Sequence, residues 1–281
     1  MLAYHYLIIK YLSYLLLFFL GLHTCEILFL KKYLFSSNPF GIWHHQTLQN
    51  DIDAICKENL KNNRLIMYVK YYLSKALLLL QVDSLFYTLM NLRLIVIFFA
   101  FFYLNPWSFF FVLMTSIILN LRFRGVFNGG SDYLSFMLQW VCLIGLSFPE
   151  AKITKIALLY LAVQVLYSYF IAGYIKITKP NWRKGSALPA LLHNSLSTWG
   201  QKFSKFLEQN ILISQIVTYV FLAFEIGFPI IVWKSDLAAF FFGFGFVFHL
   251  FNFIFLGLNR FSHIWSISYL AVWYLITVVH N

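Results

Sequence analysis

Long apolar stretches recur along the whole chain and are separated by short polar segments. A membrane-spanning α-helix needs about 20 consecutive apolar residues. With this template the pattern predicts an all-α integral membrane protein, a polytopic bundle of about eight transmembrane helices. Their ranges are 4–30, 85–104, 107–121, 132–149, 153–177, 211–233, 237–258 and 262–280. No polar tract is long enough to form a separate soluble domain, so residues 1–281 are predicted to be a single membrane domain.

Proline residues mark two of the predicted helix ends. The sequence NPW at 105–107 predicts a tight hairpin, because proline cannot continue a helix and the residue before it avoids the helical conformation. The sequence FPE at 148–150 ends the fourth helix in the same way. The first apolar run is too long for a signal peptide and lacks a small-x-small cleavage site, so we interpret it as a helix.

The segment 64–82 is apolar but carries Lys70 and Lys75. It is either a further span or an amphipathic helix in the membrane interface. If it does not span, nearly all lysines and arginines of the loops fall on one side of the membrane, whereas the bias disappears if it does. The positive-inside rule therefore favours the interfacial interpretation, with 31–84 and the loop 178–210 in the cytoplasm and both termini outside.

Composition and charge agree with a lipid bilayer as the environment. Of 281 residues, 61% are hydrophobic, 21% aromatic and only 11% charged. The net charge of +11 is explained by membrane topology and anionic lipid, so no nucleic-acid partner is needed. Cys25, Cys56 and Cys142 have neither a C-x-x-C spacing nor a metal-ligand spacing, which indicates no disulfide framework and no zinc site.

Three charged residues lie in or near the predicted spans, where a charge needs a partner or a function. Arg93 and Glu225 lie within helices, and Lys176 lies near the end of one. The first two are explained either by an ion pair or backbone contact, or by a functional role. Lys176 is explained either by snorkelling of its long side chain to the interface or by a functional role. Composition does not choose between these interpretations.

His249 and Asn252 lie three residues apart and therefore share one face of an apolar helix. A buried histidine is more often hydrogen-bonded to a neighbour than catalytic, so both interpretations stay open. The eight histidines include no H-x-x-x-H pair, and the chain has no G-x-S-x-G, Walker or G-x-G-x-x-G motif. Metal, hydrolase and nucleotide-driven chemistry therefore have no direct support in the sequence.

The segment 126–134, VFNGGSDYL, contains a turn signal before the fourth helix. Its Asn-Gly-Gly permits positive φ and a close backbone approach, and the next two residues predict a helix cap. A turn with a cap explains the segment fully, and a binding site is the alternative. The candidate residues are Asn128, Gly129, Gly130, Ser131 and Asp132. They lie on the same predicted side of the membrane as Lys176, so we expect the two groups to line one cavity.

The segment 169–185, YFIAGYIKITKPNWRKG, resembles a motif of vitamin K-dependent gamma-carboxylase that begins Tyr-Phe-Ile-Ala-Gly and continues to a tryptophan and a glycine. The NGGSDYL turn and the helix containing FHLFN resemble further signatures of that family, in the same order and at comparable spacing. Together they resemble the horizontally transferred transmembrane (HTTM) domain, which the carboxylase shares with many bacterial proteins. The similarity covers roughly 120–270, and the length is similar to small bacterial members of the sporulation-delaying protein B family.

The resemblance implies that Lys176 is the general base that deprotonates a reduced quinone, such as vitamin K hydroquinone. A lysine accepts a proton only as the neutral amine, and desolvation in a membrane helix disfavours the ammonium form. We therefore predict Lys176 and His249 as catalytic residues. Trp182 and Gly185 are predicted to shape the turn that follows, and Asn252 to hydrogen-bond the substrate.

Two features differ from the carboxylase. Ser131 stands where the family has a histidine, and the chain has no counterpart of the large lumenal portion after its last span. We expect an enzyme of the bacterial inner membrane that modifies or matures a peptide, with membrane partners encoded beside it. The alternative is a non-catalytic scaffold or immunity-type partner of a peptide-toxin system. A transporter is less favoured, because the halves show no inverted repeat.

Overall fold

The computed structural model describes residues 2–34, 50, 82–123, 130–195 and 197–280. Over these ranges the chain is helical and contains no strand, which confirms the all-α prediction. The elements fall into two compact units. The first consists of Met1–Ser13 with Ile144–Asn281, and the second of Tyr14–Leu143. Whether 1–281 acts as a single membrane domain stays a prediction.

The second unit is built from α1 from Tyr14 onward, α2, α5, α6 and most of α7. The helices are α1 (Leu2–Phe29), α2 (Lys31–Leu34), α5 (Asp83–Phe102), α6 (Pro106–Arg122) and α7 (Gly130–Ser147). The predicted hairpin joins α5 to α6. Pro106 occupies the first turn of α6, and Asn105 caps that helix by accepting a hydrogen bond from Ser108 N at 3.0 Å. The sequence NPW therefore ends one helix and begins the next.

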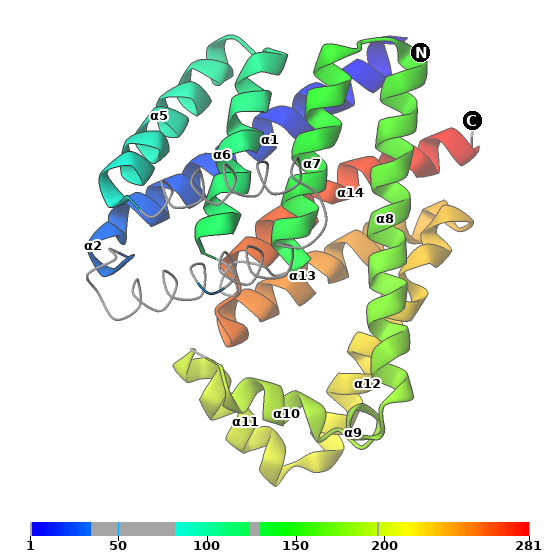
Figure 1. The fold of residues 1–281 in the computed structure, drawn as a ribbon. Helices are drawn as coiled ribbons and strands as arrows, with labels where there is room; N and C mark the ends of the chain where they lie inside the picture. The colour runs from blue at the N-terminus through cyan, green and yellow to red at the C-terminus, as the bar shows by residue number, and fades with distance from the viewer. Residues whose placement is uncertain (1, 35–49, 51–81, 124–129, 196, 281) are drawn as a thin grey trace, which may run out of the picture. The chain divides into compact units, whose positions relative to one another are not determined.

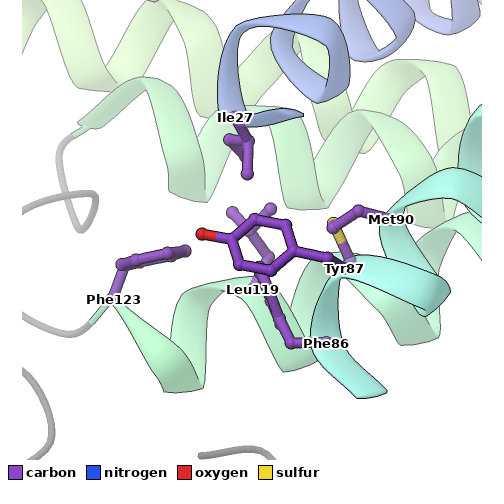
Figure 2. Packing of buried hydrophobic residues seen from close by; sticks show 6 residues of the cluster. All are labelled: Ile27, Phe86, Tyr87, Met90, Leu119 and Phe123. Carbon is purple, nitrogen blue, oxygen red and sulfur yellow. The ribbon is translucent and has the colours of Figure 1, made fainter. Parts of the chain in front are cut away.

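An aromatic core holds the ends of three helices of this unit together, as Figure 2 shows. Its buried members are Ile27, Phe86, Tyr87, Met90, Leu119 and Phe123. The rings of Phe86 and Phe123 meet edge to face, with centroids 5.6 Å apart. The guanidinium of Arg122 lies 4.2 Å from the Phe86 ring and pairs with Asp83, so a charge at the end of α6 is neutralised at the start of α5.

The first unit contains the start of α1, the end of α7 and the remaining helices, most of which are labelled in Figure 1. They are α8 (Ala151–Thr178), α9 (Pro180–Arg183), α10 (Ala187–His193), α11 (Thr198–Gln209), α12 (Ile211–Gly227), η1 (Phe228–Val232), η2 (Ser235–Leu237), α13 (Ala238–Leu256) and α14 (Asn259–His280). The long helix α8 packs against both α12 and α14, and α13 packs against α14. Residues of α8 thus meet residues that lie far away in sequence.

Each of the eight predicted apolar ranges contains a helix. Six helices of the described part are long and apolar enough to cross a membrane, which supports an integral membrane protein in a lipid bilayer. Their ranges are Tyr4–Phe29, Asp83–Phe102, Lys152–Thr178, Ile211–Val232, Ser235–Leu256 and Asn259–His280. The helix Pro106–Arg122 is apolar but shorter. The count of eight spans is therefore not confirmed, and the segment 64–82 lies outside the described residues.

The predicted loop 178–210 contains three helices, α9, α10 and α11, grouped beyond the end of α8 (Figure 1). The pattern did not predict them, because each apolar run is much shorter than a span. Leu188, Leu192 and Leu207 form a small buried core between α10 and α11. Ser204 strengthens it by donating a hydrogen bond to the carbonyl of Pro189 at 2.7 Å. The segment is a folded substructure that leads the chain from α8 into α12.

Candidate functional site

Helices α8 and α12 approach each other closely at Gly173. A Cβ atom at Gly173 would lie 2.9 Å from the Glu225 Cβ and 3.0 Å from the backbone nitrogen of Ile226. A side chain there would therefore collide with the α12 backbone as well as with side chains. Lys176 follows three residues later and lies on the same face of α8. The glycine thus places the lysine beside Glu225.

Lys176 is held by partners within the first unit. Its Nζ pairs with Glu225 Oε1, and it lies 5.3 Å from the centroid of the Trp182 ring. The carboxylate is almost completely buried, with 4% of its side chain exposed, whereas the lysine side chain is 27% exposed. The second oxygen, Glu225 Oε2, is buried and has no hydrogen-bond partner in the described part of the chain. The site therefore combines a basic amine, a buried acceptor and an aromatic face.

The turn after Lys176 is fixed by the beginning of α12. Gly185 has φ of 73°, a left-handed conformation that favours glycine, and its carbonyl accepts a hydrogen bond from Ser214 Oγ at 2.5 Å. The Gln215 side-chain amide donates to the carbonyl of Arg183 at 2.9 Å. Trp182 lies within this turn, in α9. These contacts hold the indole ring in place against the lysine.

A second polar group lies two turns earlier on α8, where Tyr169 connects three helices. Its hydroxyl lies 2.5 Å from His249 Nε2 on α13 and 2.6 Å from the Tyr269 hydroxyl on α14. All three side chains are buried. Tyr169 and Lys176 are seven residues apart, which places them on one face of α8, separated by about 10 Å along its axis.

Counting hydrogens assigns a direction to this network. If Tyr269 donates to Tyr169 and Tyr169 donates to His249 Nε2, both hydroxyl hydrogens are used. In the reverse direction one hydroxyl hydrogen has no acceptor. The favourable direction makes Nε2 an acceptor and places the imidazole hydrogen on Nδ1, which is buried without a hydrogen-bond partner in the described residues. His249 therefore carries a buried N–H that is not used by the described fold.

Asn252 lies on α13, one turn after His249, and its side chain is half-buried. Its carbonyl accepts hydrogen bonds from Gly257 and Leu258 at the end of the helix. Gly257 has φ of 75°, so the helix ends in a left-handed residue. The structure thus gives the backbone of Asn252 a capping role, and its predicted contact with a substrate stays a prediction.

The described residues of the predicted turn 126–134, which are residues 130–134, belong to the second unit. Asn128 and Gly129 lie outside the described residues, whereas Gly130, Ser131 and Asp132 form the first turn of α7. Ser131 is buried. Because Lys176 belongs to the first unit, the cavity shared by the two motifs stays a prediction.

Sequence reasoning missed two features of the site. It singled out Glu225 without assigning Lys176 as its partner, and it did not identify Tyr169 or Tyr269. Tyr169 carried a signal, since it precedes Lys176 by two helical turns. Within the described residues, no group of three or more His, Cys, Asp or Glu side chains is arranged to hold a metal ion.

Comparison with known proteins does not extend this description. No family model, curated protein or solved structure matches the chain.

Proposed function

We propose that this protein is a membrane-embedded enzyme of the HTTM type, related to vitamin K-dependent gamma-carboxylase, which modifies or matures a peptide with Lys176 as its base. The observation that supports this proposal is the placement of Lys176 between the buried Glu225 carboxylate and the Trp182 ring. The proposal includes eight spans in the bacterial inner membrane, both termini outside, and membrane partners encoded beside the chain.

The proposed step is a proton transfer to Lys176. The neutral Nζ accepts the proton of a substrate hydroxyl, the O–H bond breaks, and its electron pair stays on the substrate oxygen. The ammonium that forms is stabilised by the Glu225 carboxylate and by the face of the Trp182 ring. Because Glu225 is buried, these interactions act in a medium of low dielectric constant, where they are stronger than in water.

The residues present fit a reduced quinone, which would supply an acidic hydroxyl group when bound. Glu225 Oε2 is a buried acceptor and His249 Nδ1 a buried donor, and neither has a partner in the described structure. Such atoms match the hydroxyl groups of a hydroquinone, each of which can both donate and accept a hydrogen bond. Lys176, Glu225 and His249 would hold this group, and the half-buried Asn252 would contribute a further hydrogen bond.

A non-catalytic scaffold or immunity-type partner is the second candidate function. It is favoured by the fact that the same contacts join neighbouring helices. The Lys176–Glu225 pair joins α8 to α12, and Tyr169 joins α8 to α13 and α14. In this case the polar groups hold the helices together and take part in no reaction.

The substitution Lys176→Arg separates the two functions. Arginine retains the cation beside Glu225 but is not deprotonated in proteins, so it preserves an ion pair and removes a base. Mass spectrometry of the peptides encoded beside the protein is the assay, with Lys179→Ala at a nearby exposed lysine as the control. The enzyme proposal expects no modified peptide with folded Lys176→Arg and full modification with the control. Full modification by folded Lys176→Arg would refute it.

A further inference from the structure

Arg93 is a buried cation in the second unit. It lies midway along α5, within the candidate span Asp83–Phe102, and only 1% of its surface is exposed. A charged group in such a position is costly unless it is paired and hydrogen-bonded. Its contacts therefore show what compensates the charge.

One nitrogen of the guanidinium makes all the hydrogen bonds that the structure assigns to Arg93. Nη1 donates to the Val112 carbonyl at 3.3 Å, to Thr115 Oγ1 at 3.1 Å and to Ser116 Oγ at 2.9 Å, all on α6. Ser116 is in turn 2.8 Å from Gln139 Oε1 on α7. This network fixes the guanidinium against α6 and connects it to α7 through Ser116.

The charge of Arg93 has no counter-ion among the residues that the structure describes. Within these residues no carboxylate lies within ion-pair distance of Arg93, whereas Arg122 pairs with Asp83. Arg93 Nε is buried and has no hydrogen-bond partner in the described part of the chain. The neutral carbonyl and hydroxyl oxygens around Nη1 solvate the cation but do not neutralise it.

We propose that Arg93 binds a small carboxylate-type oxyanion, of the class of formate, acetate or bicarbonate, between α5, α6 and α7. Nε and Nη2 form the side edge of the guanidinium, whose two parallel N–H groups match two coplanar oxygens. Nη1, on the other edge, is already occupied by α6. An anion on the free edge satisfies Nε and neutralises the charge in one contact. Because Arg93 is buried midway along its helix, the ligand is a small ion and not a lipid headgroup.

The site does not depend on the function proposed for Lys176, since all its residues belong to the second unit. The polar partners of Arg93 are the Thr115 and Ser116 hydroxyls, which accept hydrogen bonds from its guanidinium. They keep the guanidinium in one orientation before the anion binds. Preorganisation of this kind lowers the entropic cost of binding.

Thermal unfolding of the purified full chain in detergent tests the proposal, with formate replacing chloride at constant pH and ionic strength. A ligand that binds only the folded state raises the melting temperature by about 3 °C at ten times its dissociation constant. We expect this saturable rise for the native protein and for Arg122→Gln, whose arginine already has a carboxylate partner. We expect it to disappear in Arg93→Gln.

Two further measurements cover the case in which Arg93→Gln does not fold. Arg93→Lys retains the charge but loses the two parallel N–H donors of the guanidinium edge. Formate should therefore raise the melting temperature of this variant no more than chloride does. Equilibrium dialysis of the native protein with radiolabelled formate should show saturable binding that Ser116→Ala weakens severalfold. Absence of saturable binding to the native protein, or an unchanged formate response in a folded Arg93 variant, overturns the proposal.

Discussion

The close approach of α8 and α12 at Gly173 leads to a prediction about two glycine substitutions. They should change the free energy of unfolding in opposite directions. Gly173→Ala places a methyl group 2.7 Å from Ile226 Cγ1 and 3.0 Å from the Ile226 backbone nitrogen. The side-chain contact can relax by rotation, but the backbone contact requires the two helices to separate. Gly243, on α13, is the matched control, because a Cβ there meets nothing within 4 Å.

The expected size follows from two opposing effects. Replacing glycine by alanine inside a helix stabilises it by about 1 kcal/mol, which applies to both positions. Overpacking destabilises by about 1 to 3 kcal/mol and applies only at Gly173. Because the contact includes backbone, the upper part of that range is appropriate there. Gly243→Ala is expected to gain up to about 1 kcal/mol, and Gly173→Ala to lose about 1 to 2 kcal/mol.

Thermal unfolding of the two variants in the same detergent measures the difference. A gap of about 2 to 3 kcal/mol corresponds to roughly 5 °C or more between their melting temperatures. Under the proposed function Gly173→Ala should also weaken peptide modification, because separation of the helices moves Lys176 away from Glu225. A Gly173→Ala protein as stable as Gly243→Ala would refute the close packing of α8 on α12.

The remaining predictions concern the contacts around this helix pair. Lys176→Met alone leaves the Glu225 carboxylate buried and unpaired and should lower the free energy of unfolding by about 2 kcal/mol, whereas adding Glu225→Leu should restore most of it. A double variant no more stable than Lys176→Met would contradict this in denaturation measurements. Tyr169→Phe removes the central hydroxyl of its network and should lower stability by about 1 to 3 kcal/mol, and an unchanged melting temperature would show that the network contributes little. Gly185→Ala should destabilise the protein more than Gly257→Ala does. Both glycines have positive φ, but only Gly185 lies against the backbone of α12. Equal decreases in melting temperature would contradict this contact.

The positions of the long helices follow from local pattern. Apolar runs predicted the long helices of the described residues to within a few residues, and NPW at 105–107 predicted the α5–α6 hairpin. The three helices within 178–210 were not predicted, because a short apolar run such as that of α10 is stabilised mainly by the helices against which it packs. The number of helices that cross the membrane also depends on the length of each apolar helix, since Pro106–Arg122 is helical and apolar but shorter than the candidate spans.

The sequence by itself determined that this is a helical membrane protein, and it singled out Lys176, Glu225, Arg93 and His249 as polar groups at unusual positions. The length of an apolar run and the cost of a buried charge are local quantities that can be read without a fold. Tertiary structure decided the partners. Lys176 meets a glutamate 49 residues away, and His249 meets a tyrosine 80 residues away, because helix packing brings distant segments together. Arg93 by contrast contacts hydroxyl groups and, among the described residues, no carboxylate, a difference that only the packing of α5 on α6 revealed.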